Sequence, residues 1–174
     1  MKDIDWCFRK GNGISLVEPN KNLADSYILK SEDSLKEITN SQSKDWKVIT
    51  AYYSTYQSLY AVLSRIGIKC EIHECTIKFM RKFLSKYFTE EECNFIKKSC
   101  ESRNNVQYYT NKDITDSQRN LMIKKSPEFV VKCKNILQKI TEQEINSIRN
   151  EVTAFQSNLK KSKKELIKNW ETRC

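Results

Sequence analysis

Glycine and proline are scarce in this chain, and that scarcity limits its fold more than any other feature. Of 174 residues, only 3 are Gly and 2 are Pro. Strands joined by tight turns depend on both residue types, so neither an all-β nor a Rossmann-like fold is expected. Apolar residues instead recur every three or four positions, the period of an amphipathic helix. The sequence therefore predicts an all-α antiparallel helical bundle of four to five core helices with a long C-terminal helix.

Periodicity divides the chain into three parts. Residues 1–19 show no period and are expected to form a loosely ordered N-terminal arm that docks through Trp6 and Phe8. Residues 20–140 carry the helical bundle, and residues 141–174 carry a long basic C-terminal helix. Helices are predicted over residues 20–39, 45–66, 72–87, from Thr89 past Arg103, over 116–140 with Pro127 as either a kink or a new helix start, and over 141–170.

The C-terminal helix has a second property, which bears on assembly. Its apolar positions from Ile145 to Leu166 follow a near-heptad spacing. A helix of this length exceeds what a small bundle needs, so its far end is expected to project or to meet another subunit.

The charge of the chain is strongly positive and uneven. Lys and Arg number 31 against 22 Asp and Glu, a net charge of +9, and residues 119–174 alone hold 13 basic and 6 acidic residues, a net +7. A basic C-terminal third favours an anionic partner, such as nucleic acid or an acidic protein surface. The alternative is an ordinary solvated helix surface.

Several classes of chemistry are excluded by residue counts. Gly11, Gly13 and Gly67 are too few and too scattered to form a phosphate-binding glycine loop. His73 is the only histidine, which excludes two-histidine metal sites and histidine relays within one chain. No apolar run is long enough for a membrane span. We therefore expect no cofactor, no metal and no membrane association.

Seven cysteines are present, at positions 7, 70, 75, 93, 100, 133 and 174. The number is odd, and no pair has the C-x-x-C spacing of redox or zinc sites. We therefore expect free thiols in a reducing, cytoplasmic setting, with neither a disulfide nor a structural metal.

Arg103 is the most unusual candidate site residue. It continues an apolar stripe formed by Cys93, Ile96 and Cys100. Burying a guanidinium without a partner is costly. Either its aliphatic stem extends the charge to water, or the charge is kept inside for a purpose.

The helix predicted over 45–66 carries two distinct faces. A face of large residues lies beside a stripe of small ones, which suits a central helix that a neighbour approaches closely. Aromatic stripes at this spacing are more often core than base-stacking surfaces. The large face is Trp46, Ile49, Tyr53, Tyr56, Tyr60 and Leu63, and the small stripe is Ala51, Ser54, Ser58 and Ala61.

Residues 20–140 resemble the HEPN domain (higher eukaryotes and prokaryotes nucleotide-binding), a helical bundle. The resemblance rests on four features in order along the chain. They are the tyrosine-rich helix Ala51–Leu63, the Gly67 turn followed by His73 opening the next helix, Arg103 followed by Tyr108, and the Phe129-Val130 pair in a long helix.

The resemblance implies a dimer in which an arginine and a nearby histidine of each subunit face a shared cleft. Members that cleave RNA use the arginine to hold phosphate and the histidine to move protons. Here Tyr108 stands at the histidine position, and a free phenol titrates near 10, too high for a base at neutral pH. Arg103 and Tyr108 are also five residues apart, about 140° around a helix, so they are expected to converge only if the helix ends near Val106. For His73 the expected role is a local cap or a surface hydrogen bond.

The leading functional hypothesis is a dimeric HEPN-like binding module without clear catalysis. It would engage RNA, a nucleotide or a partner nucleotidyltransferase in a prokaryotic toxin–antitoxin or defence system, with Arg103, Tyr108, Tyr53, Tyr56 and His73 as binding residues. One alternative is a residual metal-independent ribonuclease that uses Arg103, Asn104 and Tyr108. Another is a purely structural helical subunit that assembles through the C-terminal seam.

Overall fold

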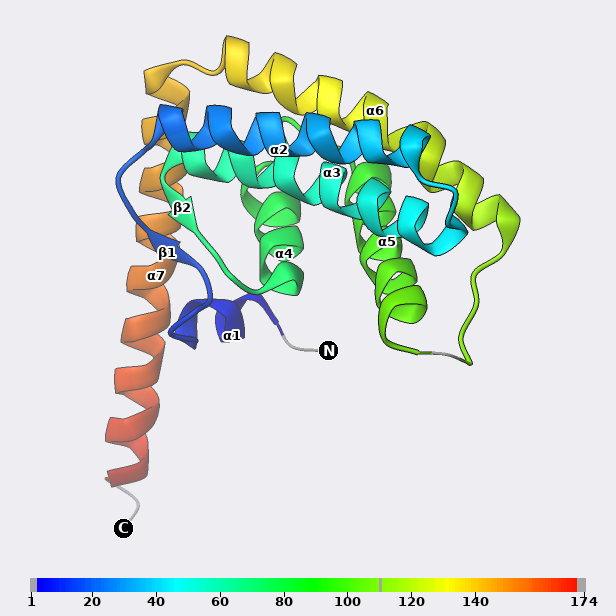
Figure 1. Cartoon of the computed structure of the whole chain (residues 1–174). Helices are drawn as coiled ribbons and strands as arrows, with labels where there is room; N and C mark the ends of the chain where they lie inside the picture. Colours follow the sequence, from blue (N-terminus) through cyan, green and yellow to red (C-terminus); the bar gives the residue numbers. More distant parts are fainter. Residues whose placement is uncertain (1–2, 110, 172–174) are drawn as a thin grey trace.

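The computed structural model describes residues 3–109 and 111–171, with side chains of the last helix described as far as residue 161. Over these residues the chain is an all-α bundle, which confirms the predicted fold class (Figure 1). The two short strands, β1 (Ser15–Leu16) and β2 (Ile68–Lys69), pair antiparallel. The helices are α1 (Ile4–Arg9), α2 (Lys21–Asn40), α3 (Lys44–Ile66), α4 (His73–Phe83), α5 (Glu90–Tyr108), α6 (Asp116–Lys139) and α7 (Glu142–Glu171).

Helix α3 forms the centre of the bundle. It packs against α2, α5 and α6, and Figure 1 shows α2, α3 and α6 running alongside one another above α4 and α5. All four residues of the predicted small stripe on α3 are fully buried. The neighbouring helices approach closely enough for their hydroxyls to reach the α3 backbone. Ser31 Oγ donates to the Ser54 carbonyl at 2.8 Å, and Ser126 Oγ donates to the Ala51 carbonyl at 3.0 Å.

Helix ends follow local sequence signals. Gly67 ends α3 in the left-handed conformation (φ 76°, ψ 45°), which glycine adopts without steric cost. A capping box of Thr89 and Glu92 begins α5, and Thr141 and Glu144 exchange the same reciprocal hydrogen bonds at the start of α7.

Two helix predictions differ from the structure. Helix α4 ends at Phe83 and not at residue 87, because the backbone N–H groups of Tyr87 and Phe88 both donate to the Leu84 carbonyl and form a turn that redirects the chain into α5. Helix α6 continues through Pro127 without interruption, so a new helix start there is ruled out.

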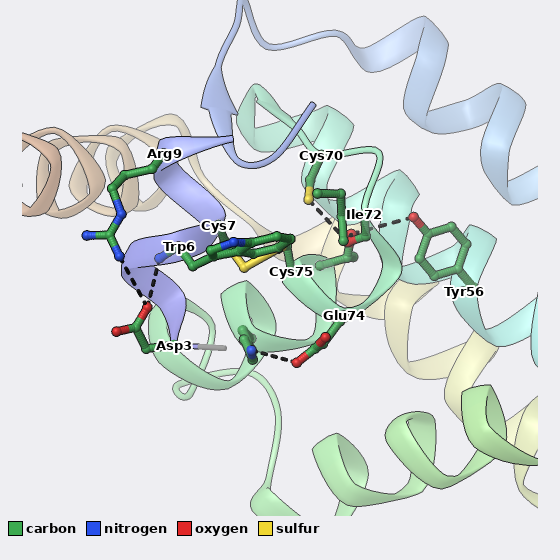
Figure 2. Close-up of a disulfide and its surroundings, with 11 residues drawn as sticks. Asp3, Trp6, Cys7, Arg9, Tyr56, Cys70, Ile72, Glu74 and Cys75 are labelled. Atoms are coloured by element: carbon green, nitrogen blue, oxygen red, sulfur yellow. Dashed lines mark hydrogen bonds and ion pairs between the residues drawn. A yellow bond between two sulfur atoms is a disulfide. The ribbon is translucent and has the colours of Figure 1, made fainter. Parts of the chain in front are cut away.

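The N-terminal arm is ordered, in contrast to the loose arm expected from its lack of period. It contains α1 and β1, and Phe8 docks against Phe83 and Phe155 at ring-centroid distances of 6.1 and 5.3 Å. Figure 2 shows Cys7 of α1 bonded to Cys75 of α4. The expectation that the cysteines are all free thiols is therefore wrong. The C-x-x-C pattern detects only cysteines that are close in sequence, whereas Cys7 and Cys75 are 68 residues apart.

Helix α7 begins against the bundle and then leaves it. Ile145, Ile148 and Val152 are buried in the core shared with the rest of the chain. Figure 1 shows the later turns of α7 extending past α1. Leu166, at the far end of the predicted seam, lies outside the residues whose side chains are described. The first half of the seam is thus occupied by the chain's own bundle.

A search of the described helices for a segment long and apolar enough to cross a membrane finds none.

Candidate anion-binding site

Arg103 is buried near the C-terminal end of α5, with only 6% of its surface exposed. Of the two interpretations of its place on an apolar stripe, extension of the charge to water is therefore wrong. Its Nη1 donates to Gln107 Oε1 at 3.2 Å and to Tyr108 Oη at 3.3 Å, and its Nη2 lies 3.3 Å from His73 Nδ1. Its Nε is buried and has no hydrogen-bond partner among the described residues.

No carboxylate among the described side chains pairs with Arg103. Its hydrogen-bond partners are an amide, a phenol and an imidazole, none of which supplies a negative charge at neutral pH. A buried guanidinium ordinarily has an acidic partner, because removing a charge from water costs several kcal/mol. The site therefore holds a positive charge that the described part of the chain leaves uncompensated.

Three tyrosine rings surround this charge and make up what we call the tyrosine cage: Tyr52, Tyr53 and Tyr108. The Cζ atom of Arg103 lies 4.9, 5.3 and 5.7 Å from their respective ring centroids, within the range of cation–π attraction. Burial opposes the charge on Arg103, but the neighbouring Tyr53 and Tyr52 outweigh it, so the pKa of Arg103 is raised. The guanidinium stays charged at every physiological pH.

Tyr52 is the buried member of the cage. Burial, followed by the neighbouring Cys100 thiol, raises the pKa of Tyr52 far above its usual range. Its hydroxyl is therefore neutral and lies 2.5 Å from His73 Nδ1. Tyr108, in contrast, is 64% exposed, so its ring is open to solvent next to the buried guanidinium.

His73 begins α4 and lies against the rings of Tyr52 and Tyr56 of α3. Its ring stacks on Tyr56 at a centroid distance of 4.0 Å and an angle of 13°. Its Nδ1 faces two groups, Tyr52 Oη and Arg103 Nη2. Because a guanidinium can only donate, Nδ1 must carry a lone pair, and this network assigns the ring proton to Nε2.

The protonation state of His73 agrees with that geometry. Burial, and then the nearby positive charge of Arg103, lower the pKa of His73 to about 4. The imidazole is neutral at pH 7. The expected role as a cap or surface hydrogen bond is wrong, since the N-cap of α4 is Ile72, which forms no side-chain cap, and His73 instead orients Arg103 and Tyr52.

The structure brings together most of the predicted site residues. Arg103 contacts Tyr108, Tyr53 and His73 directly, and Tyr56 joins them through its stack on His73. Asn104 does not join them. It follows Arg103 by about 100° around α5, and its side chain makes no hydrogen bond with the described residues.

The predicted condition for convergence of Arg103 and Tyr108 is wrong. Helix α5 does not end near Val106 but continues through Tyr108. The two side chains nevertheless meet, because the long arginine side chain and the phenol ring together span the angular separation that the backbone leaves.

Sequence reasoning missed two residues of the site. Tyr52 contributes the buried hydroxyl, and Gln107 contributes the amide oxygen. A signal existed for each: Tyr52 and Tyr56 are four residues apart, as are Arg103 and Gln107, and residues at that spacing share a helix face. The candidate tyrosines come from the predicted face of large residues, which includes Tyr53 and Tyr56 but not Tyr52.

Two surface hollows flank the site and share Gln107. One, of about 520 Å³, is lined by Tyr108, Tyr109 and the basic residues Lys44, Lys112 and Arg119 among others. The other, of about 740 Å³, lies between α2 and α3 beside Tyr53 and the half-exposed Trp46. Neither hollow is lined by Arg103 itself; both reach its partner Gln107, and each contains acidic as well as basic side chains.

No group of three or more metal-binding side chains is found among the described residues. No model of a known protein family matches the chain, and a search of curated proteins finds no match. The HEPN resemblance rests on the sequence segments alone.

Proposed function

We propose that the chain is a binding module that holds a phosphate group of RNA or of a nucleotide at Arg103. The observation that carries this proposal is the guanidinium, 6% exposed and without a carboxylate partner among the described side chains. A phosphate would supply the missing negative charge and accept from the guanidinium through its planar array of donors.

The surroundings of Arg103 support this ligand class. The exposed Tyr108 ring offers a surface on which a base can stack, as sequence-tolerant single-strand binding requires. The net charge of +9 favours encounter with a polyanion. Both features extend the sequence-based hypothesis of a HEPN-like module for RNA or nucleotide.

Binding without catalysis is the better-supported form of the proposal. A general base must accept a proton near neutral pH. His73 is a poor base because its pKa is lowered to about 4 and its Nδ1 already faces two donors. The ribonuclease alternative retains one favourable observation, the direct contact between Arg103 and Tyr108.

Titration with labelled RNA tests the proposal. Fluorescence anisotropy of a fluorescein-labelled oligoribonucleotide should report binding that weakens steeply as salt rises. Arg103→Ala should remove most of that binding. Arg65→Ala is the matched control, because Arg65 is also an arginine of the bundle but is paired with Glu142 at 2.6 Å.

The outcomes separate the candidate functions. Equal losses in the two variants would contradict a specific role for Arg103. A free nucleotide that competes with the RNA would identify the nucleotide as a sufficient ligand. Cleavage of the RNA that disappears in both Arg103→Ala and Tyr108→Phe would establish the ribonuclease alternative instead.

Assembly is a separate part of the proposal. We expect a homodimer, and a partner nucleotidyltransferase encoded nearby, from the HEPN resemblance. Light scattering of the purified chain tests the homodimer, and co-purification tests the partner nucleotidyltransferase. The purely structural alternative loses support because Ile145, Ile148 and Val152 of the seam are buried within the chain's own bundle.

A further inference from the structure

The Cys7–Cys75 disulfide lies in the same turn of α4 as His73. Cys75 follows His73 by two residues, within the first turn of the helix. Figure 2 shows the disulfide on one side of this turn and Tyr56, on which His73 stacks, on the other. A change at the disulfide therefore occurs within one helical turn of His73, which contacts Arg103.

The bond is the covalent link between α4 and an arm that also packs on the core through Ile14 and Trp6 and is hydrogen-bonded through Val17 to Gly67 and Arg149. Helix α1 is six residues long, too short to be stable by itself, and β1 contributes two residues to its sheet. The arm is further held by Phe8 and by the Glu71 N–H, which donates to the Asn12 carbonyl at 3.0 Å. Cys7 is fully buried at the point where the arm meets α4.

The start of α4 depends on tertiary contacts for its position. Its N-cap residue, Ile72, forms no side-chain cap, whereas α2, α3, α5 and α6 each have a capping side chain. The first turn of α4 is therefore placed by what touches it from outside. Those contacts include the bond to Cys7, the stack of His73 on Tyr56, and the hydrogen bonds of His73 Nδ1 with Tyr52 and Arg103.

We propose that the Cys7–Cys75 disulfide is a redox control of ligand affinity at the Arg103 site. In the oxidised protein, the bond fixes the first turn of α4 and holds His73 Nδ1 against Arg103 and Tyr52. In the reduced protein, the covalent link between the arm and the first turn of α4 is lost, His73 loses its fixed position, and the guanidinium is no longer oriented toward its ligand. This inference rests on the proposed function of the site.

The chemistry needs a dithiol reductant. Cys7 and Cys75 are both fully buried, so the thiolate of the reductant attacks one sulfur of the bond when the arm opens locally, and its second thiol resolves the mixed disulfide. The protein gains two electrons and two protons as two thiols, and the reductant becomes a disulfide.

The test compares the affinity of the oxidised and reduced protein for the same labelled oligoribonucleotide. Peptide mapping by mass spectrometry first establishes the Cys7–Cys75 link in the air-oxidised protein, and its absence would overturn the proposal. Treatment with dithiothreitol should then raise Kd about fivefold or more, the lower end of typical coupling between two sites. The Cys7→Ser/Cys75→Ser variant should bind like the reduced protein and should not respond to dithiothreitol.

A second variant tests whether the effect passes through His73. Oxidised His73→Ala should bind as weakly as the reduced protein, and reduction should weaken it no further, because both changes remove the same contact. Independent, additive losses would overturn the route through His73. A circular dichroism spectrum of the reduced protein at the assay temperature must remain helical, since global unfolding would make the bond a structural link and would overturn local control.

The two proposals fail in different ways. Equal affinity in the oxidised and reduced states would overturn the redox control and leave the binding module intact. Absence of binding in the oxidised protein would overturn the binding module, and the redox control with it.

Discussion

Arg103 and Arg119 are buried to almost the same extent and are compensated in opposite ways. Their exposed fractions are 6% and 7%, and the Nε atom of each is buried with no hydrogen-bond partner among the described residues. Arg119 lies between two carboxylates, with Nη1 bonded to Asp116 and Nη2 3.5 Å from Asp113. Arg103 faces phenols, an amide and an imidazole.

The difference separates a buried charge that has carboxylate partners from one that has none, and the proposed function depends on the second. Arg119 is neutralised locally and ties the segment before α6 to the first turn of that helix. Arg103 has hydrogen bonds and aromatic rings around it but no negative charge from the described side chains. Burial alone therefore does not distinguish the two arginines, whereas the charge and chemical nature of their neighbours do.

The largest expected effect is on RNA binding. Arg103→Ala should cost about 3 kcal/mol of binding free energy, roughly a hundredfold in Kd, as expected for truncation of one member of a desolvated charge pair. Arg119→Ala should change Kd by no more than about threefold, because its charge is already neutralised. Anisotropy titrations at one salt concentration measure both. Similar losses in the two variants would break the comparison.

The pH dependence of stability tests the neutral state of His73. The pKa of His73 is about 4 in the folded protein and about 6.5 in an unfolded chain. Below about pH 6.5 the unfolded chain therefore binds the proton first, so stability should fall as pH drops toward 4, by up to about 2 kcal/mol after allowance for partial exposure. Chemical denaturation at several pH values measures the fall.

The matched control for that experiment is His73→Asn, which keeps an acceptor near Nδ1 but does not titrate. The free energy of unfolding of this variant should change less over the same pH range. Because His73 is the only histidine, its imidazole signals in a proton NMR titration are assigned without ambiguity. A midpoint near 6.5 in the folded protein would contradict the contact with Arg103.

A carboxylate supplied beside Arg103 should make it resemble Arg119. Gln107→Glu places a negative charge where the Gln107 amide oxygen accepts from Arg103 Nη1. We expect the new carboxylate to form an ion pair with the guanidinium. RNA binding should then weaken about tenfold, which corresponds to about 1.4 kcal/mol. Gln107→Met removes the hydrogen bond without adding charge and is the control. Equal Kd values for the two variants would show that charge at this position is irrelevant.

The smallest expected effect is on folding. Arg103→Met should leave the free energy of unfolding within about 1 kcal/mol of the unsubstituted protein, because the apolar side chain removes a desolvated charge and still fills the tyrosine cage. Arg119→Met should lower it by about 1 kcal/mol through loss of its ion pairs. Urea denaturation compares them. A large destabilisation by Arg103→Met would make Arg103 a structural residue.

Local features of the structure were predictable because their causes are local. The capping box of Thr89 and Glu92, the left-handed Gly67 and the small stripe on α3 each depend on residues a few positions apart. Arg103 was also identified, since a charged residue on an apolar stripe is visible within one helix. Such signals need no knowledge of how helices are arranged.

The composition of the site was predicted only in part, for reasons of distance. The contact between His73 and Arg103 joins residues 30 positions apart, and no helix period predicts which face of α4 meets which face of α5. Tyr52 was missed because its neighbour Tyr53 shares its residue type, and only packing decides which of the two is buried beside His73.

The sequence by itself determined the helices, their caps and the presence of a misplaced arginine, because hydrophobic period, turn chemistry and charge act over a turn or two of chain. Tertiary structure decided that this arginine meets tyrosines and an imidazole and no acid, and that Cys7 reaches Cys75. Those outcomes depend on which helix faces are buried together, a competition for apolar contact across the whole bundle that no single segment encodes.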